Sequence, residues 1–110
     1  MIRGRPKGDP IVIVDDHYTV QVHDREQWLA FASECNVVLP VNAEPGWREG
    51  DTVLVKRLRF AGEVRFVPLG RLVNPLNHRR VRAPDRVVML EVVGIEQGML
   101  VWSLSGATKP

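Results

Sequence analysis

The chain has 110 residues and a mass of 12.4 kDa, a size that fits a single domain. Hydrophobic residues make up 45% of the sequence and charged residues 25%, so the composition is that of a folded chain rather than a disordered one. A net charge of +2 does not by itself indicate a nucleic-acid-binding protein. No apolar run approaches the roughly 20 residues of a membrane-spanning helix, and no signal-peptide pattern follows the basic first residues, so no membrane partner is expected.

Three features of residue usage narrow the fold class. Val occurs 18 times against 10 Leu and 6 Ala, and this excess of a β-branched residue favours strands. Arg outnumbers Lys by 12 to 3, which favours planar, bidentate contacts with partners. Cys35 stands alone, which excludes a disulfide framework and a multi-cysteine metal site. We therefore expect Cys35 to be a small buried hydrophobe in a chain made in a reducing cytoplasm.

Residues 1–10 are expected to form an extended basic arm, residues 11–106 the domain, and residues 107–110 a tail. In the arm, Arg3, Arg5 and Lys7 alternate with Gly and Pro, which do not propagate a helix or a central strand. The Arg-Gly-Arg-Pro tetrapeptide resembles the core of an AT-hook, which lays Arg side chains into a narrow minor groove. The preferred interpretation is an arm that packs on a neighbouring subunit, and DNA binding is the alternative.

The first half of the domain predicts short strands over 11–14, 18–22 and 36–41, separated by polar turns. The segment 25–34 is ambiguous, because its apolar residues fit both a helical stripe capped by Asp24 and a strand buried on both sides. We favour the strand because the segments on either side of it also predict strands.

The second half predicts further strands over 52–60, 63–68, 86–93 and 99–104. Residues 70–79 resemble a loop, and Val81 is expected to pair briefly at a sheet edge. The run over 86–93 is the most hydrophobic and is expected to be central, followed by a hairpin loop over 95–97. The expected fold is therefore all-β, a single small β-sandwich or jelly-roll-like domain of about eight short strands.

Charge is distributed unevenly along the chain. Residues 9–51 carry nine acidic and two basic residues, a net charge of −7, whereas residues 56–86 carry nine basic and two acidic residues, a net charge of +7. Opposite charges on one small domain favour docking onto copies of itself or onto a polar partner. The expected partner contacts, besides the arm residues, are the Arg side chains of the 70–86 loop region: Arg71, Arg79, Arg80 and Arg82.

No catalytic residue, metal site or cofactor is expected. His17, His23 and His78 show no metal-binding or triad spacing, and the usual nucleophile, phosphate-loop and zinc motifs are absent from the sequence. Of the three Trp residues, Trp28 and Trp102 lie in apolar runs and are expected in the core. Trp47 follows a glycine in a polar turn, so it is expected to be exposed and available for a ligand contact.

The order of short motifs over residues 16–106 resembles a small β-module of tailed-bacteriophage structural proteins. The resemblance rests on Leu-Pro at 39–40, Gly-Asp-Thr-Val at 50–53, Gly-x-Val-x-Phe at 62–66 and Trp-x-Leu-Ser-Gly at 102–106. The Arg-rich middle departs from that pattern, which is usually richer in Gly and Ala. The resemblance implies a virion structural role, in homotrimers or other multivalent assemblies, and brings no catalytic residues.

Together these observations predict a non-enzymatic virion protein, a capsid decoration or cement protein or a head-fibre subunit. It would dock on major capsid or tail subunits and form a homo-oligomer, with a trimer favoured. One alternative is a receptor- or glycan-binding tip module of a tail fibre, which an exposed Trp47 would favour. A second alternative is a nucleic-acid-binding β-domain that uses the basic arm and the 70–86 loop, although no aromatic residue lies between Phe66 and Trp102 to stack on bases.

Overall fold

A computed structural model describes residues 10–44, 46–73 and 78–110, so the arm residues Arg3, Arg5 and Lys7 lie outside the described part. Within it the chain forms eleven strands and one short 3-10 helix, η1, over Val22–Asp24. The strands are β1 Ile11–Ile13, β2 His17–Thr19, β3 Trp28–Phe31, β4 Cys35–Leu39, β5 Thr52–Arg57, β6 Val64–Pro68, β7 Arg71–Val73, β8 Arg80–Val81, β9 Val87–Glu96, β10 Met99–Gly106 and β11 Thr108–Lys109.

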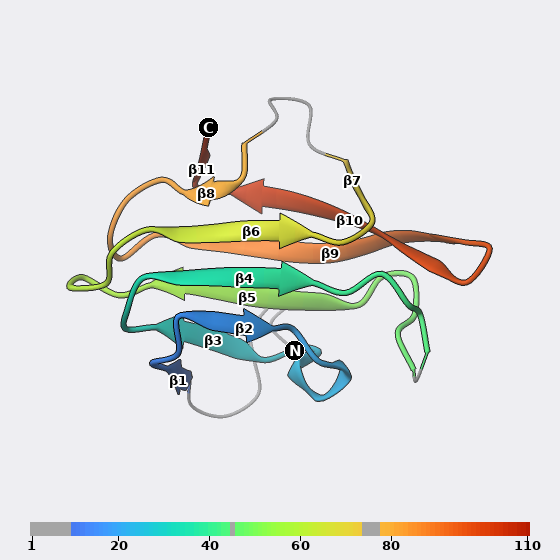
Figure 1. The fold of residues 1–110 in the computed structure, drawn as a ribbon, viewed down its shortest axis with the longest axis horizontal. Coiled ribbons are helices and arrows are strands. Elements are labelled where there is room, and N and C mark those ends of the chain that lie inside the picture. Colours follow the sequence, from blue (N-terminus) through green and yellow to red (C-terminus); the bar gives the residue numbers. More distant parts are fainter. Residues whose placement is uncertain (1–9, 45, 74–77) are drawn as a thin grey trace, which may run out of the picture.

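The strands form two packed sheets, which confirms the prediction of a small all-β sandwich (Figure 1). The six-stranded sheet has the order β1-β3-β5-β9-β10-β7, and the five-stranded sheet, nearer the viewer in Figure 1, has the order β11-β8-β6-β4-β2. The first six strands alternate between the two sheets. Neighbours within a sheet therefore run parallel, as β1, β3 and β5 do in one sheet and β2, β4 and β6 in the other.

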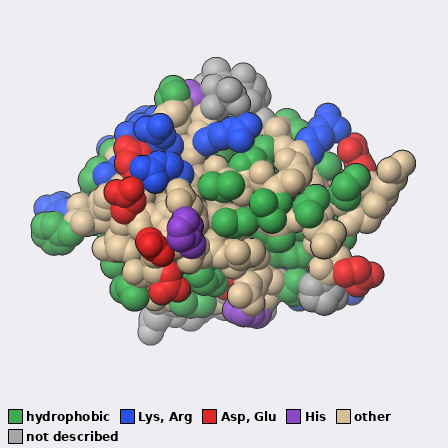
Figure 2. All heavy atoms as spheres, viewed as in Figure 1, with side chains coloured by type: hydrophobic (Ala, Val, Ile, Leu, Met, Phe, Trp, Pro, Cys, Tyr) green, Lys and Arg blue, Asp and Glu red, His purple; other side chains and the backbone are tan. Residues whose placement is uncertain are grey.

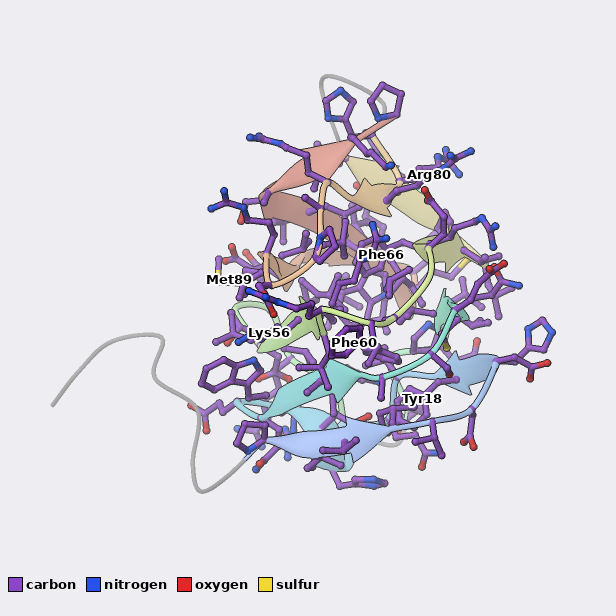
Figure 3. The ribbon with its side chains drawn as sticks, turned by 90° about the vertical axis from the view of Figure 1, so that its left-hand side faces the viewer. Tyr18, Lys56, Phe60, Phe66, Arg80 and Met89 are labelled. Carbon is purple, nitrogen blue, oxygen red and sulfur yellow. The ribbon has the colours of Figure 1, made fainter. Side chains whose placement is uncertain are left out.

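The core lies between the sheets because alternate residues of each strand point inward. In β4 the inward residues are Cys35, Val37 and Leu39, and in β5 they are Val53 and Val55, all of them buried. Figure 3 shows Phe66 of β6 pointing into this layer. Since β-branched side chains suit a pleated surface, the Val-rich composition supplies both inner faces.

The predicted central strand is confirmed as β9, which lies inside the six-stranded sheet between β5 and β10. The predicted hairpin loop over 95–97 is too long, because Ile95 and Glu96 belong to β9 and pair with β10. The chain reverses at Gln97 and Gly98, whose φ angles are +53° and +77°. Two successive positive φ values are those of a type I′ turn, the tight turn that suits the twist of a hairpin.

The segment 25–34 contains β3, as the preferred strand interpretation predicted. The strand predicted over 18–22 is shorter than expected, because β2 ends at Thr19 and η1 follows. The Asp24 carboxylate accepts a 2.8 Å hydrogen bond from the backbone N–H of Gln21, which stabilises this early turn.

Two predictions for the last third of the domain are wrong. The supposed loop over 70–79 contains β7, which pairs in parallel with β10. The supposed tail over 107–110 contains β11, which pairs with β8, so Val81 lies in an inner strand rather than at an edge. Strands of two or three residues are too short to show a sequence pattern of their own, and here pairing with β10 and β8 defines them.

Candidate docking surface

The outer face of the five-stranded sheet is polar at one end. His17, Asn36 and Arg65 lie side by side in register on β2, β4 and β6. Arg65 donates to the Asn36 Oδ1 atom at 3.3 Å and forms an ion pair with Glu34 at 3.1 Å. This end of the face is thus occupied by its own hydrogen bonds and ion pair, and its polar groups have partners within the chain.

The other end of the same face is apolar. Val38 and Val67 are partners across the β4–β6 pair. Pro40 lies two residues after Val38, and Leu69 lies two residues after Val67, just beyond the ends of the two strands. Val67 is 39% exposed and Leu69 is 61% exposed. The Leu69 N–H donates to the Leu39 carbonyl at 3.1 Å, which fixes the backbone at this point. We call these four residues the apolar patch; Figure 2 shows hydrophobic side chains gathered on this side of the sheet.

An open groove of about 640 Å³ adjoins the apolar patch. Pro40 and Leu69 belong to both, so the patch and the groove form one continuous surface. The remaining groove residues combine an apolar floor with a polar rim: Val20, Gln21, Val22, His23, Arg25, Val41, Asn42, Glu44 and Trp47.

Trp47 contributes to the groove from below, and the prediction that it is exposed is wrong. Its side chain is only 5% exposed and packs edge-to-face on Trp102, with ring centroids 5.0 Å apart. The Trp102 Nε1–H donates to the Pro40 carbonyl at 2.8 Å, which ties this pair to the start of the groove. An aromatic residue in a polar turn is buried here because the turn folds back over the centre of the core.

The 3-10 helix that borders the groove is held by a fully buried carboxylate, that of Asp24. Its Oδ2 atom accepts hydrogen bonds of 2.8 Å from both the Tyr18 hydroxyl and the Gln21 N–H. Burial, and then this hydrogen bond to Asp24, raise the pKa of Tyr18 above its ordinary value. The exposed His23 imidazole lies 3.6 Å from the other oxygen, Oδ1.

The other two Trp predictions have mixed outcomes. Trp102 is fully buried, as predicted. Trp28 is only half-buried on the outer face of β3, where the Lys56 ammonium lies 5.7 Å from the ring centroid, a cation–π arrangement. The prediction that Trp28 lies in the core is therefore wrong.

The four predicted Arg contacts lie on β7 and around β8, at the end of the sandwich away from β1 and β2 (Figure 1). Arg71 and Arg80 are engaged within the chain, with Glu96 at 3.1 Å and Glu63 at 3.6 Å. Arg79 and Arg82 are exposed and have no acidic partner among the described residues. Only two of the four therefore have a guanidinium group free of an ion pair within the described chain.

Glu63, the residue before β6, contacts two basic side chains at this end of the sandwich. Besides Arg80, its carboxylate contacts the Lys109 ammonium of β11 at 3.0 Å. The hydrogen bond from Lys109 lowers the pKa of Glu63, and the nearby charges of Lys109, Arg80 and Arg57 act in the same direction. A carboxyl whose pKa is lower in the folded state stabilises the fold above its unfolded pKa and loses that contribution as pH falls through the folded value.

We expect Glu63→Gln to lower the melting temperature most at neutral pH and to lower it progressively less as the pH falls below about 4, the ordinary range of a glutamate pKa. Melting curves between about pH 3 and pH 7 test this, with Glu49→Gln, an exposed residue of the turn before β5, as the control. An equal loss for Glu63→Gln at every pH would contradict the assignment.

Chemical groups for catalysis are sparse in the described ranges. They contain no cluster of three or more His, Cys, Asp or Glu residues that could hold a metal ion. Cys35 is buried, and burial, followed by the charges of Asp15 and Asp16, raises the pKa of its thiol to about 11. In the part of the chain that is described, no helix is long and apolar enough to cross a membrane.

No family model, no curated protein and no solved structure matches this chain. The candidate site therefore rests on geometry. Sequence analysis missed the apolar patch, although one signal was present: the runs Val37-Val38-Leu39 and Val67-Pro68-Leu69 place apolar residues at consecutive strand positions. Consecutive apolar residues put one side chain on each face of a sheet, so an outward apolar position could have been expected.

Proposed function

We propose that this chain is a non-enzymatic structural subunit of a bacteriophage particle, a capsid decoration or head-fibre protein that docks on another virion protein through the apolar patch. The observation that carries the proposal is the exposure of Val67 and Leu69 beside an open groove on an otherwise hydrogen-bonded sheet face. The resemblance of residues 16–106 to a module of phage structural proteins supports the class of partner, a major capsid or tail subunit.

The chemistry of the patch fits a protein partner. Val, Pro and Leu side chains on a sheet lose little conformational freedom on binding, and contiguous exposed apolar surface marks interaction sites in soluble proteins. The polar rim of the groove, with Arg25, His23 and Glu44, supplies groups that fix orientation around an apolar centre. We expect an apolar loop or strand of the partner to lie along β6 and to enter the groove at Leu69.

Neither alternative has comparable support. The glycan-binding alternative depended on an exposed Trp47, and that side chain is buried under the groove. The nucleic-acid alternative uses the basic arm, which lies outside the described residues, and the 70–86 loop, where Arg71 and Arg80 form ion pairs with Glu96 and Glu63. The docking proposal, in contrast, depends on Val67 and Leu69, whose side chains are exposed.

The proposal predicts that Leu69→Asp abolishes incorporation into particles, because a carboxylate in the apolar patch would lose its hydration on docking. Particles purified from infected host cells carry either the wild-type or the variant gene, and quantitative mass spectrometry gives the copy number. The control is Val93→Asp, which places the same charge at an exposed apolar position of β9, in the other sheet and away from the patch.

We expect at least a ten-fold loss of copies for Leu69→Asp and little loss for Val93→Asp, with the melting temperatures of the purified variants close to that of the wild type. Absence of the wild-type protein from particles would overturn the virion role. Full incorporation of Leu69→Asp would overturn the assignment of the patch. The nucleic-acid alternative would be supported instead if the wild-type protein were absent from particles and bound DNA, and if replacing Arg79 and Arg82 abolished that DNA binding.

A further inference from the structure

The two sheets end together at both ends of the sandwich. At one end, which we call the head end, the edge strands are β1 and β2; at the other, the tail end, they are β7 and β11 (Figure 1). No strand in the described ranges pairs with the outer side of any of these four. Unpaired N–H and C=O groups along such edges are ready templates for another strand.

The edge strands at the two ends run in matching directions. In the six-stranded sheet β1 is parallel to β5, β9 is antiparallel to both, and β10 and β7 are antiparallel to β9, so β7 is parallel to β1. In the five-stranded sheet β8 is antiparallel to β6 and to β11, so β11 is parallel to β2. A head end placed against a tail end would therefore continue both sheets with the parallel pairing already present in β1–β3 and β2–β4.

The two ends also carry complementary charge. At the head end, Asp15 and Asp16 connect β1 to β2, and neither carboxylate has a cationic partner within the described residues. At the tail end, Arg79 and Arg82 flank β8 and lack an acidic partner, as noted above. Figure 3 shows how far apart the two ends are, with Tyr18 of β2 toward one end of the five-stranded sheet and Arg80 of β8 toward the other.

Apolar surface accompanies the charge at the head end. Val12, in β1, is 59% exposed, and Val14, in the connection to β2, is 69% exposed. At the tail end Val73 of β7 is 41% exposed. These side chains would be covered if β1 of one copy lay beside β7 of the next.

We propose that a second copy of this chain docks head to tail, with β1 and β2 of one copy beside β7 and β11 of the other and Asp15 and Asp16 facing Arg79 and Arg82. Such a contact is heterologous, because two different surfaces of the chain meet. Repeating it gives a closed ring if the rotation between successive copies adds up to a full turn, and an open row of copies if it does not. The expected homotrimer corresponds to a closed ring of three. This contact does not use the apolar patch, so either proposal can fail without the other.

Charge reversal tests the head-to-tail contact. The head variant is Asp15→Lys/Asp16→Lys and the tail variant is Arg79→Glu/Arg82→Glu. Sedimentation velocity at about 0.05 M and about 0.5 M salt measures self-association of each, since screening weakens contacts between exposed charges. The control, Glu49→Lys/Glu91→Lys, changes the net charge as the head variant does, but its residues lie in the turn before β5 and in the inner strand β9, away from both ends.

We expect the wild type to self-associate, more strongly at low salt, and each variant alone to associate about ten-fold or more weakly. An equimolar mixture of the head and tail variants should associate again, because the reversed head meets the reversed tail. The quadruple variant should also associate again. A wild type that stays monomeric up to about 1 mM, a mixture that stays dissociated, or equal loss in the control would overturn the proposal.

Discussion

Replacing Trp102 with Ala is expected to reduce the free energy of unfolding by about 3–5 kcal/mol, the cost of emptying a large aromatic site in a core. Trp102 is fully buried at the centre of β10 and packs edge-to-face on Trp47. Because a small domain is stable by only about 5–15 kcal/mol in total, this single change removes a large share of the stability. Urea unfolding followed by circular dichroism measures the loss without relying on Trp fluorescence.

Trp102→Phe separates the two contributions of this side chain. The phenyl ring retains most of the contact with Trp47 but loses the Nε1–H that donates to the Pro40 carbonyl at 2.8 Å. A lost hydrogen bond to a partly buried carbonyl costs roughly 1–3 kcal/mol, so the Phe variant should fall between the wild type and the Ala variant. An Ala variant within about 1 kcal/mol of the wild type would contradict the central packing of this ring.

The parts of the fold that could be predicted from the sequence are those with a long or regular local pattern. In β5, the buried residues Val53 and Val55 alternate with Thr52, Leu54 and Lys56, and the β-branched run of this segment is typical of a strand. The ten residues of β9 carry enough consecutive apolar side chains to indicate an inner strand. The Gly residue at position 98 marked the hairpin, although the turn proved tighter than its surroundings indicated.

What could not be predicted depends on partners far away in the chain. Trp47 looks exposed when only its Gly and Arg neighbours are considered, and its burial follows from packing on Trp102. The short strands β7 and β11 exist because β10 and β8 offer them pairing partners. The parallel arrangement of β1, β3 and β5 likewise follows from the alternation of the chain between two sheets, which no local pattern encodes.

The charge asymmetry of the sequence has a different meaning in the folded chain. Several acidic and basic residues from opposite halves neutralise one another inside the same molecule, as Glu34 does with Arg65 at 3.1 Å. Asp51 and Arg25 lie 3.6 Å apart within the first half. A difference in net charge along the sequence therefore overstates the charge available for partners. Asp15 and Asp16 at one end of the sandwich, and Arg79 and Arg82 at the other, have no ion-pair partner among the described residues, and they carry the argument for docking.

Replacing Asp24 with Ala is expected to be the second most damaging change, with a loss of roughly 2–4 kcal/mol in the free energy of unfolding. Its Oδ2 atom is the acceptor for both the Tyr18 hydroxyl and the Gln21 N–H, at 2.8 Å each. Without the carboxylate, both donors lose their acceptor in a partly buried region, and η1 loses the contact that starts it. Urea unfolding by circular dichroism gives the loss, and Asp24→Asn, which keeps one oxygen acceptor, should lose less.

A double-mutant cycle with Tyr18→Phe isolates the hydrogen bond between the two side chains. Tyr18→Phe in the wild-type background removes a donor that has a charged acceptor, whereas in the Asp24→Ala background it removes a donor that is already unsatisfied. We therefore expect Tyr18→Phe to destabilise the wild type by about 1 kcal/mol or more and to cost nothing, or even stabilise, once Asp24 is gone. Additive losses would mean that the two side chains act independently, and the buried carboxylate would then stabilise the turn at Gln21 without holding Tyr18.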